Sequence, residues 1–599
     1  MRLRDLIICS VCIIIAAALL ITAGARLDYI NSQRQQMKLI INAPLENAPP
    51  SLAFATVAMG AFRGLVVDVL WMRADQLKEQ GQFFDAKQLA EWITTLQPRF
   101  ASVWEFQAWN MAYNISVAIP ATQPDQRWRW VKNGYELLRD QGIPLNPKSL
   151  ALYHELARIF QHKIGGVTDD AHKYYKIQLA MAMELLLGPA DNQYFDVLAQ
   201  APKEWDQIAE DPNFKPLIVA LQSADKSFSG SKPQEFMSNY LSLRQNAARF
   251  TPAAAAVIDN FRGTELLNKF DIFTRAYQLR NVWKLDPVLV LQLNKTYGPI
   301  DWTDPNSCLP LDWRHPDSHA IYWAVKGLQT AAKDKSREID ISETNTDRIV
   351  FHSLQNLFRN GKIFIYDVPV EAPSENYSQP PQTQMFKDIF LRPDLRMFEP
   401  YNKAMLAVMG KYKNPQDKMI YESLQNSHRN MLKNAIFSFY QAGHKQQAQK
   451  IYDELRQLYP LNEFEVSLVE FARKRFLEEL DSIGIDDAKE QVLLLLREGY
   501  LLYAIRDDDE AFGREKMAQE VYDYYRSKYS DENRIDLPEF KLLRYLSLID
   551  FLNDQQYPPY LRGGLLGRIK VERPELLEQL QQQEKNLMEQ LKQSEQPTQ

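Results

Sequence analysis

Histidines, carboxylates and tryptophans gather near the middle of the chain, where they could bind a metal ion or a ligand. The stretch begins at Tyr297 and ends at Trp323, and it contains Trp302, Asp312, Trp313, Arg314, His315, Asp317 and His319. His315 and His319 are four residues apart, a spacing that suits two metal ligands on one helix. Nearby side chains could complete the ligand set: Asp312, Asp317 and His352. Pro316 favours a helix start between the two histidines, so their side chains need not share a face.

Three interpretations of this stretch stay open. The residue types favour a rigid plug, in which the indoles are buried and the carboxylates cap helices. A binding groove could instead use Trp302, Trp313 and Arg314 to hold a peptide, or a glycan stacked on the indoles. The third interpretation is a metal-dependent enzyme.

A second group of histidines and carboxylates surrounds a glycine turn between two expected helices. It comprises His162, Asp169, Asp170 and His172, with Gly165 and Gly166 between the first two. A metal ion or an anion could bind at the start of the helix that follows the turn. The same residue types cap helices, because Thr168 suits the first position and carboxylates in the first turn favour the helix dipole. We therefore interpret this group as a helix cap.

The sequence contains no recognisable catalytic motif. Nucleotide-binding glycine loops, the HExxH of zinc proteases and the GxSxG of hydrolases are all absent from it. A formal net charge of -6 lacks the basic excess that phosphate neutralisation requires, which disfavours nucleic acid as the partner. We expect no enzymatic activity, no cofactor and no small-molecule substrate, and we interpret the acidic run Asp507 to Glu510 as a solvated turn.

Residues 1–25 are interpreted as a transmembrane anchor. Leu6 to Ala25 is an uncharged apolar run that is long enough to cross a bilayer. Arg2 and Arg4 precede it, and a short basic head begins export signals, so we expect the bulk of the chain outside the bacterial inner membrane. Cleavage after Ala25 is the alternative, because Ala23-Gly24-Ala25 has a small-x-small pattern; it would release an exported soluble protein.

The remaining sequence divides into mainly helical segments at runs of proline and glycine. The expected segments are a stalk (26–50), an N-terminal helical domain (51–263), a central helical region with the Trp- and Pro-rich insert (264–367), a Pro-rich exposed loop (368–384), a C-terminal helical domain (385–570) and a Gln- and Glu-rich helical tail with a disordered end (571–599). Ile363 to Tyr366 could form one short strand.

Helical pairs recur with a regular spacing. In the first half, Trp104 follows Leu70 by 34 residues, and the helix between them ends at Pro98. In the second half, an apolar helical pattern from Leu432 is followed by Gly443, Ala448 and Pro460. This order and period resemble the tetratricopeptide repeat (TPR). The resemblance implies an α-solenoid of stacked helical pairs, whose concave surface binds a segment of another protein.

A wider resemblance rests on the anchor together with Trp104 to Asn114, His162 to Gly166 and Tyr297 to Trp302. These features resemble an uncharacterised family of large bacterial membrane-anchored TPR-like proteins, which implies no known activity. We therefore expect a mainly α protein that acts as a scaffold or adaptor, binding protein partners at the cell envelope in assembly, transport or export. The expected groove residues are Trp104, Trp109 and Tyr113, besides Trp302, Trp313 and Arg314. A metal-binding module or enzyme and a glycan-binding module remain the alternatives.

Overall fold

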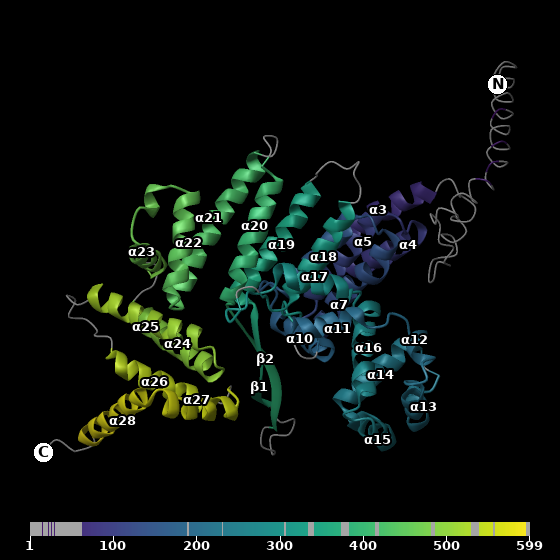
Figure 1. Ribbon diagram of the computed structural model, residues 1–599. Coiled ribbons are helices and arrows are strands. Elements are labelled where there is room, and N and C mark those ends of the chain that lie inside the picture. Colours follow the sequence, from purple (N-terminus) through teal and green to yellow (C-terminus); the bar gives the residue numbers. More distant parts are fainter. Residues whose placement is uncertain are drawn as a thin grey trace. The chain divides into compact units, whose positions relative to one another are not determined.

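The computed structural model describes residues 63–187, 191–230, 232–304, 307–332, 341–372, 382–413, 418–480, 485–528, 538–554 and 557–594, with Ile15, Thr22, Arg26 and Tyr29 before them. Within these residues the chain is mainly α-helical, as the sequence predicts, with one pair of strands (Figure 1). Apart from four residues, the predicted anchor and stalk lie outside the described part. Among the described helices, none is both long enough and apolar enough to cross a membrane.

The chain forms two compact units, each assembled from separate stretches of sequence. Unit 1 comprises residues 1–188, 193–290 and 315–353, and unit 2 comprises residues 189–192, 291–314 and 354–599. The predicted boundaries at residues 263 and 367 do not coincide with these units. The region expected to form a central domain is instead divided between them.

Helices are the regular elements of unit 1 in its described residues, and turns and loops connect them. Its main elements are α3 (Arg63–Glu79), α4 (Phe83–Leu96), α5 (Ala101–Trp109), η2 (Asn110–Ile115), α6 (Ser116–Ala118), α7 (Pro124–Leu137), η3 (Leu138–Gly142), α8 (Ile143–Leu145), α9 (Leu150–Arg158), η4 (Ile159–Ile164), α10 (His172–Leu187), α11 (Asn192–Gln200), α12 (Asp206–Ala209), α13 (Lys215–Ala224), α14 (Pro233–Gln245), α15 (Pro252–Asn260), α16 (Glu265–Asn281) and α18 (Pro316–Ala331). Two further helices, α17 (Pro287–Tyr297) and α19 (Ile341–Asn360), are divided between the units, and the first residue of α11, Asn192, also belongs to unit 2.

The first helical pair, α3 and α4, turns at a glycine. Gly81 has a φ of +76°, a left-handed conformation that glycine adopts without a steric penalty. Ala90 and Ile93 lie three residues apart on α4 and are completely buried. They form a small core with Val67 of α3 and Val103 of α5. The small and apolar residues of the predicted first repeat therefore pack as helix-contact residues.

Three successive helices of unit 1 widen into π-helical turns, which the sequence did not predict. These turns are η2, η3 and η4, which follow α5, α7 and α9 directly. Close packing surrounds them: a Cβ added to Gly134 would lie 2.8 Å from the Ala108 carbonyl oxygen. The helix α9 starts at Leu150, and the side chain of Asn146 before it donates to the carbonyl of Pro98 at 2.9 Å.

Unit 2 combines a β-hairpin with helices. Its main elements are β1 (Lys362–Ala372), β2 (Gln382–Arg392), α20 (Phe398–Lys411), α21 (Lys418–Gln441), α22 (Lys445–Leu458), α23 (Leu468–Leu480), α24 (Ile485–Ala504), α25 (Asp508–Lys528), α26 (Phe540–Asn553), α27 (Pro559–Glu572) and α28 (Pro574–Ser594). The helix expected in the tail is α28, and it is not a detached appendage, because Leu576 and Leu580 belong to the core that α24 to α27 share.

The hairpin corrects the prediction for residues 368–384. The two strands pair antiparallel from Lys362 opposite Arg392 to Ala372 opposite Gln382. The predicted strand at Ile363 to Tyr366 is therefore confirmed and is longer than expected, and the prediction of a loop at both ends of 368–384 is wrong. The prolines suggested a loop, but Pro369 is compatible with a two-stranded sheet, because both of its strands are edge strands. Residues 373–381 lie outside the described part.

The acidic run at the start of α25 is only partly the solvated turn that the sequence suggested: Asp508 and Asp509 are exposed, whereas the side chain of Asp507 is largely buried. Asp507 lies 3.1 Å from Lys362 Nζ and 2.5 Å from Arg392 Nη1, at the base of the hairpin. The next two carboxylates also meet partners: Asp508 lies 3.0 Å from Arg568, and Asp509 lies 3.2 Å from His444 Nε2. The run therefore joins the hairpin, α27 and the α21–α22 turn to the start of α25.

Candidate functional site

Trp104, Trp109 and Tyr113, which were predicted to line a groove, differ in how deeply they are buried. Trp104 is only 4% exposed, and its indole N–H donates to the Pro98 carbonyl at 3.0 Å, so its assignment to a groove is wrong. A tryptophan at a helix-contact position is buried by the helix that packs on it. Trp109 and Tyr113 are half-buried and stacked, with ring centroids 6.3 Å apart. The guanidinium of Arg158 covers the Tyr113 ring at 4.9 Å, so this ring already has a partner.

The central tryptophans do not form one surface either. Trp302 is 48% exposed and lies edge-on to His444, with ring centroids 4.8 Å apart. Trp313 is 1% exposed, and its indole N–H donates to Asn294 Oδ1 at 2.9 Å, so its assignment to a groove is also wrong. Arg314 is engaged by Asp312 through two hydrogen bonds of 2.9 and 2.8 Å. Trp313 therefore belongs to the interior, as the plug interpretation expects, while Trp302 lies at the surface.

His315 and His319 lie at the buried start of α18. The backbone N–H of Asp317 donates to His315 Nδ1 at 3.2 Å, so His315 is the N-cap of a helix that begins at Pro316, as predicted. The His319 ring stacks on Phe160, with centroids 4.9 Å apart, and neither histidine is more than 1% exposed. His352 lies elsewhere, on α19 against Phe351. In the described residues no group of three or more His, Cys, Asp or Glu side chains could hold a metal ion.

Asp169 is the centre of the second predicted group. Its carboxylate accepts hydrogen bonds from Arg127 at 3.1 Å, Lys163 at 2.5 Å, the Ala171 N–H at 2.9 Å and Tyr175 at 3.3 Å. Burial opposes the charge of this carboxyl group, but the bonds from Lys163 and Ala171 outweigh it and lower the pKa of Asp169. Asp170 and His162 are exposed, so the four predicted residues do not converge. Asp169 accepts a backbone N–H in the turn before α10 and is the anion of a buried ion-pair network.

The two stretches that the sequence suggested separately meet in the interior of unit 1. A Cβ added to Gly165 would lie 3.3 Å from Asp317 Oδ2. Lys176 is 1% exposed and donates to the Gly166 carbonyl at 2.6 Å, next to His172 Nδ1 at 3.0 Å. Burial lowers the pKa of Lys176 to about 8, and the charge of Asp317 opposes that shift. These polar groups therefore hold η4, α10 and α18 together.

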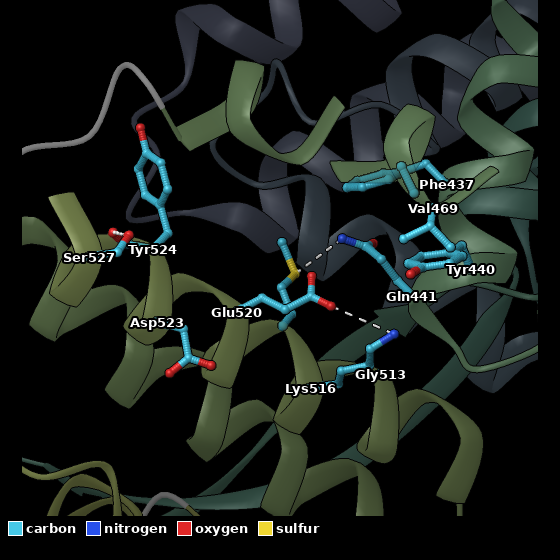
Figure 2. Close-up of a pocket in the computed structure, with 12 residues that line it drawn as sticks. Phe437, Tyr440, Gln441, Val469, Gly513, Lys516, Glu520, Asp523, Tyr524 and Ser527 are labelled. Atoms are coloured by element: carbon cyan, nitrogen blue, oxygen red, sulfur yellow. Dashed lines mark hydrogen bonds and ion pairs between the residues drawn. The ribbon is translucent and has the colours of Figure 1, made fainter. Parts of the chain in front are cut away.

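Unit 2 contains a cavity between helices that are far apart in sequence. It has a volume of about 410 Å³, within the ~300–1,000 Å³ that is usual for ligand sites in proteins. Its walls come from α21, α23 and α25: Phe437, Tyr440, Gln441, Val469, Ala472, Gly513, Lys516, Met517, Glu520, Asp523, Tyr524 and Ser527. Figure 2 shows residues of α21 and α23 on one side and the α25 residues on the other. We call this cavity the α25 groove.

The α25 groove has an apolar part and a polar part. Phe437, Val469 and Met517 contribute apolar surface, and Val469 is 59% exposed. Lys516 lies over the ring of Tyr440 at 4.4 Å and pairs with Glu520 at 3.6 Å (Figure 2). Burial raises the pKa of Tyr440, and the charge of Glu520 adds to the shift.

Further along α25, the groove is acidic. Asp523 is exposed, and its carboxylate accepts a hydrogen bond from Gln519 Nε2 at 3.0 Å. Asp523 lies three residues after Glu520, so the two carboxylates share one face of α25. Figure 2 shows Asp523 on the α25 side of the groove, away from the labelled side chains of α21. The groove therefore offers apolar surface at one end and negative charge at the other.

Two glycines allow the helices of the groove to meet. Gly443 has a φ of +85° and turns the chain from α21 into α22, at the position where the repeat pattern predicts a turn. A Cβ added to Gly513 would lie 2.8 Å from the Gln441 carbonyl oxygen, so only glycine permits this approach of α25 to α21. The repeat pattern predicted the α21–α22 pair but not the groove. The available signal was Gly513, a glycine inside an otherwise regular helix.

The geometry of the groove is typical of a binding site, because apolar surface lies beside charged side chains. Its lining residues include no histidine and no cysteine, and the Ser527 hydroxyl donates to the Tyr524 carbonyl at 2.8 Å. Comparison with other proteins adds no assignment: no protein-family model matches the chain, and no curated protein shows a significant match.

Proposed function

We propose that this protein is a non-enzymatic, TPR-like scaffold or adaptor, anchored in the bacterial inner membrane, that holds a segment of a partner protein in the α25 groove. The observation that carries the proposal is the groove itself: an apolar cavity of about 410 Å³ with a polar end, bounded by three helices. Stacked helical pairs commonly bind extended or helical segments on the surface that they share.

The composition of the groove supports recognition rather than chemistry. Its apolar wall is partly open, and exposed apolar surface beside charged groups is characteristic of sites that bind other molecules. Val469, at 59% exposure, is an apolar side chain that a partner would bury. Lys516 and Glu520 neutralise each other, so a partner needs only to complement the acidic end.

The cellular part of the proposal rests on the sequence. The apolar run Leu6 to Ala25 with its basic head supports an anchor whose bulk is extracytoplasmic, and the 34-residue spacing and the Leu432 to Pro460 pattern support a TPR-like stack. A role in envelope assembly, transport or export follows from that location. An adaptor in that place would hold exported or membrane proteins near the bilayer.

Site-directed photocrosslinking tests this function in cells. A photoreactive amino acid would replace Val469 in the groove or, as a control, Val571 on α27, which is 80% exposed and does not line the groove. We expect a discrete crosslinked partner from position 469 that is absent from position 571. Equal crosslinking from both positions, or none from position 469, would refute the groove as the partner site.

A further inference from the structure

The side chains of α25 that face the groove differ in charge and polarity along the helix. Their order indicates which chemical groups a ligand must present. From the N-terminal end they are Lys516, Met517, Glu520, Asp523, Tyr524 and Ser527. They recur at intervals of three and four residues and therefore form one stripe. The cation at the start is already occupied, since Lys516 contacts both Tyr440 and Glu520. The charge that remains for a ligand is the acidic end at Asp523.

The apolar end of the groove is the place for one large side chain. Met517 of α25 and Phe437 of α21 both line the cavity, and the Met517 sulfur accepts a hydrogen bond from Gln441 Nε2 of α21 at 3.5 Å, which links the two helices. Val469 and Ala472 form the α23 side. Burying one large apolar side chain on such surface is the largest single contribution to binding that this site can supply.

The distance between the two ends sets the spacing of the ligand. Met517 and Asp523 are six residues apart on α25, which corresponds to about 9 Å along the helix axis. An extended chain covers about 3.3 Å per residue, so about three residues span the same distance. At the apolar end, side-chain contacts bridge α21 and α25: Lys516 Nζ lies 4.4 Å from the centre of the Tyr440 ring, and Gln441 Nε2 lies 3.5 Å from the Met517 sulfur. A ligand helix of ~10 Å diameter would have to part these contacts, so the extended form fits better.

From these observations we infer that the α25 groove binds an extended segment in which a lysine or arginine lies about three residues from a large apolar side chain. This inference rests on the proposed function and adds the chemistry of the partner to it. The apolar side chain enters between Phe437 and Met517, and the basic side chain pairs with Asp523. An exposed ion pair of this kind adds specificity rather than much affinity.

Synthetic peptides test the inference with the full chain in detergent micelles. The probe is a fluorescein-labelled ten-residue peptide of Gly and Ser with one Trp and one Lys three positions later; the comparison peptides carry Glu in place of Lys, or Lys one or six positions from Trp. Fluorescence anisotropy reports binding. We expect the Lys peptide at a spacing of three to bind best, and the Glu peptide to bind about five-fold more weakly.

A charge reversal in the protein provides the decisive comparison. Asp523→Lys should reverse the preference, so that the Glu peptide binds better than the Lys peptide. Asp453→Lys on α22 is the matched control, because Asp453 is also exposed, also accepts a hydrogen bond from a glutamine four residues earlier, at 2.9 Å, and does not line the groove. Asp453→Lys should leave the preference unchanged.

Val469→Trp places a large side chain in the apolar end of the groove from an exposed position, and Val571→Trp is its control. The pair of variants shows whether peptide binding occurs in the groove at all. Peptide binding that Val469→Trp abolishes, but that is indifferent to charge and spacing, overturns the inference and leaves the proposed function intact. Absence of binding by every peptide overturns the inference alone, and crosslinking from position 469 then decides the proposed function. A change in the sedimentation of the protein itself with Val469→Trp would identify a second copy as the occupant, and would also overturn the inference.

Discussion

Replacing His428 by glutamine should remove a pH dependence that is built into the helix carrying one wall of the α25 groove. His428 lies on α21 and is completely buried. Its Nε2 contacts Asn402 Oδ1 of α20 at 2.8 Å, and its Nδ1 contacts the Tyr459 hydroxyl at 2.8 Å, just beyond the end of α22. An amide oxygen accepts and a hydroxyl can donate, so these contacts fit a neutral imidazole with its proton on Nε2.

The size of the effect follows from the pKa of His428. Burial lowers it to about 4, whereas the unfolded chain has the ordinary value of about 6.5. Between these values the unfolded state binds a proton that the folded state does not, so stability falls as the pH falls from 6.5 towards 4. One pKa unit corresponds to about 1.36 kcal/mol. The free energy of unfolding should therefore fall by about 2 kcal/mol at pH 5 and by about 3 kcal/mol at pH 4.

Hydrogen–deuterium exchange measured by mass spectrometry can assign this loss to α21 and α22. After correction for intrinsic exchange rates, the opening free energy of peptides from these helices should be about 2 kcal/mol lower at pH 5 than at pH 7.5. In His428→Gln the value at pH 7.5 should fall by about 1 kcal/mol, because one hydrogen bond is lost, and the pH dependence should disappear. His154→Gln is the control, since burial lowers the pKa of His154 to about 4 as well, but in unit 1.

Two results would refute this reasoning. One is an unchanged pH dependence of α21 and α22 in His428→Gln. The other is an NMR titration of the His428 ring with a pKa near 6.5, which would mean that the imidazole is hydrated. A pH dependence that His154→Gln removes from α21 would show that the effect does not originate at His428.

Three further substitutions test other contacts. Gly513→Ala should destabilise unit 2 by about 2 kcal/mol, because its Cβ would press on the Gln441 carbonyl, whereas Gly563→Ala, with no atom within 4 Å, should be neutral or stabilising in thermal unfolding. Asp507→Asn should reduce the stability of unit 2 by about 3 kcal/mol and expose the strands of the hairpin to hydrogen exchange. Asp367→Asn loses only an exposed ion pair with Lys387 and should reduce the stability by less than about 1 kcal/mol. Asp169→Asn should destabilise unit 1 by about 3–5 kcal/mol in urea unfolding, because Arg127 and Lys163 would remain buried without their counter-charge, while the exposed Asp170→Asn should have little effect.

Local signals in the sequence predicted local structure well. Pro316 marks the start of α18, and Gly443 marks the turn after α21, because proline and glycine act on the backbone of their own neighbourhood. Aromatic residues were less informative. Trp104 and Trp302 have the same side chain, yet one is 4% and the other 48% exposed, and that difference depends on helices elsewhere in the chain.

Features that depend on distant pairing could not be predicted from one sequence. The hairpin needs eleven residues on each side of a proline-rich segment to pair, and the composition of that segment alone suggested a loop. The α25 groove joins Phe437 to Tyr524 through a contact at Gly513, and no local pattern connects them. The π-helical turns depend on one extra residue per helix, which a helical periodicity does not reveal.

The contacts at the start of α25 explain why the groove can select a ligand at its other end. Asp507 is held by Lys362 and Arg392, Asp509 lies beside His444, and Gly513 packs on the backbone of α21. These contacts precede Lys516 and fix the apolar end before a ligand arrives, so binding there loses little conformational entropy. Asp523 is six residues beyond Met517, outside these restraints, and its carboxylate is exposed. Affinity should therefore come mainly from the fixed apolar end, and discrimination between basic and acidic segments from the exposed carboxylate.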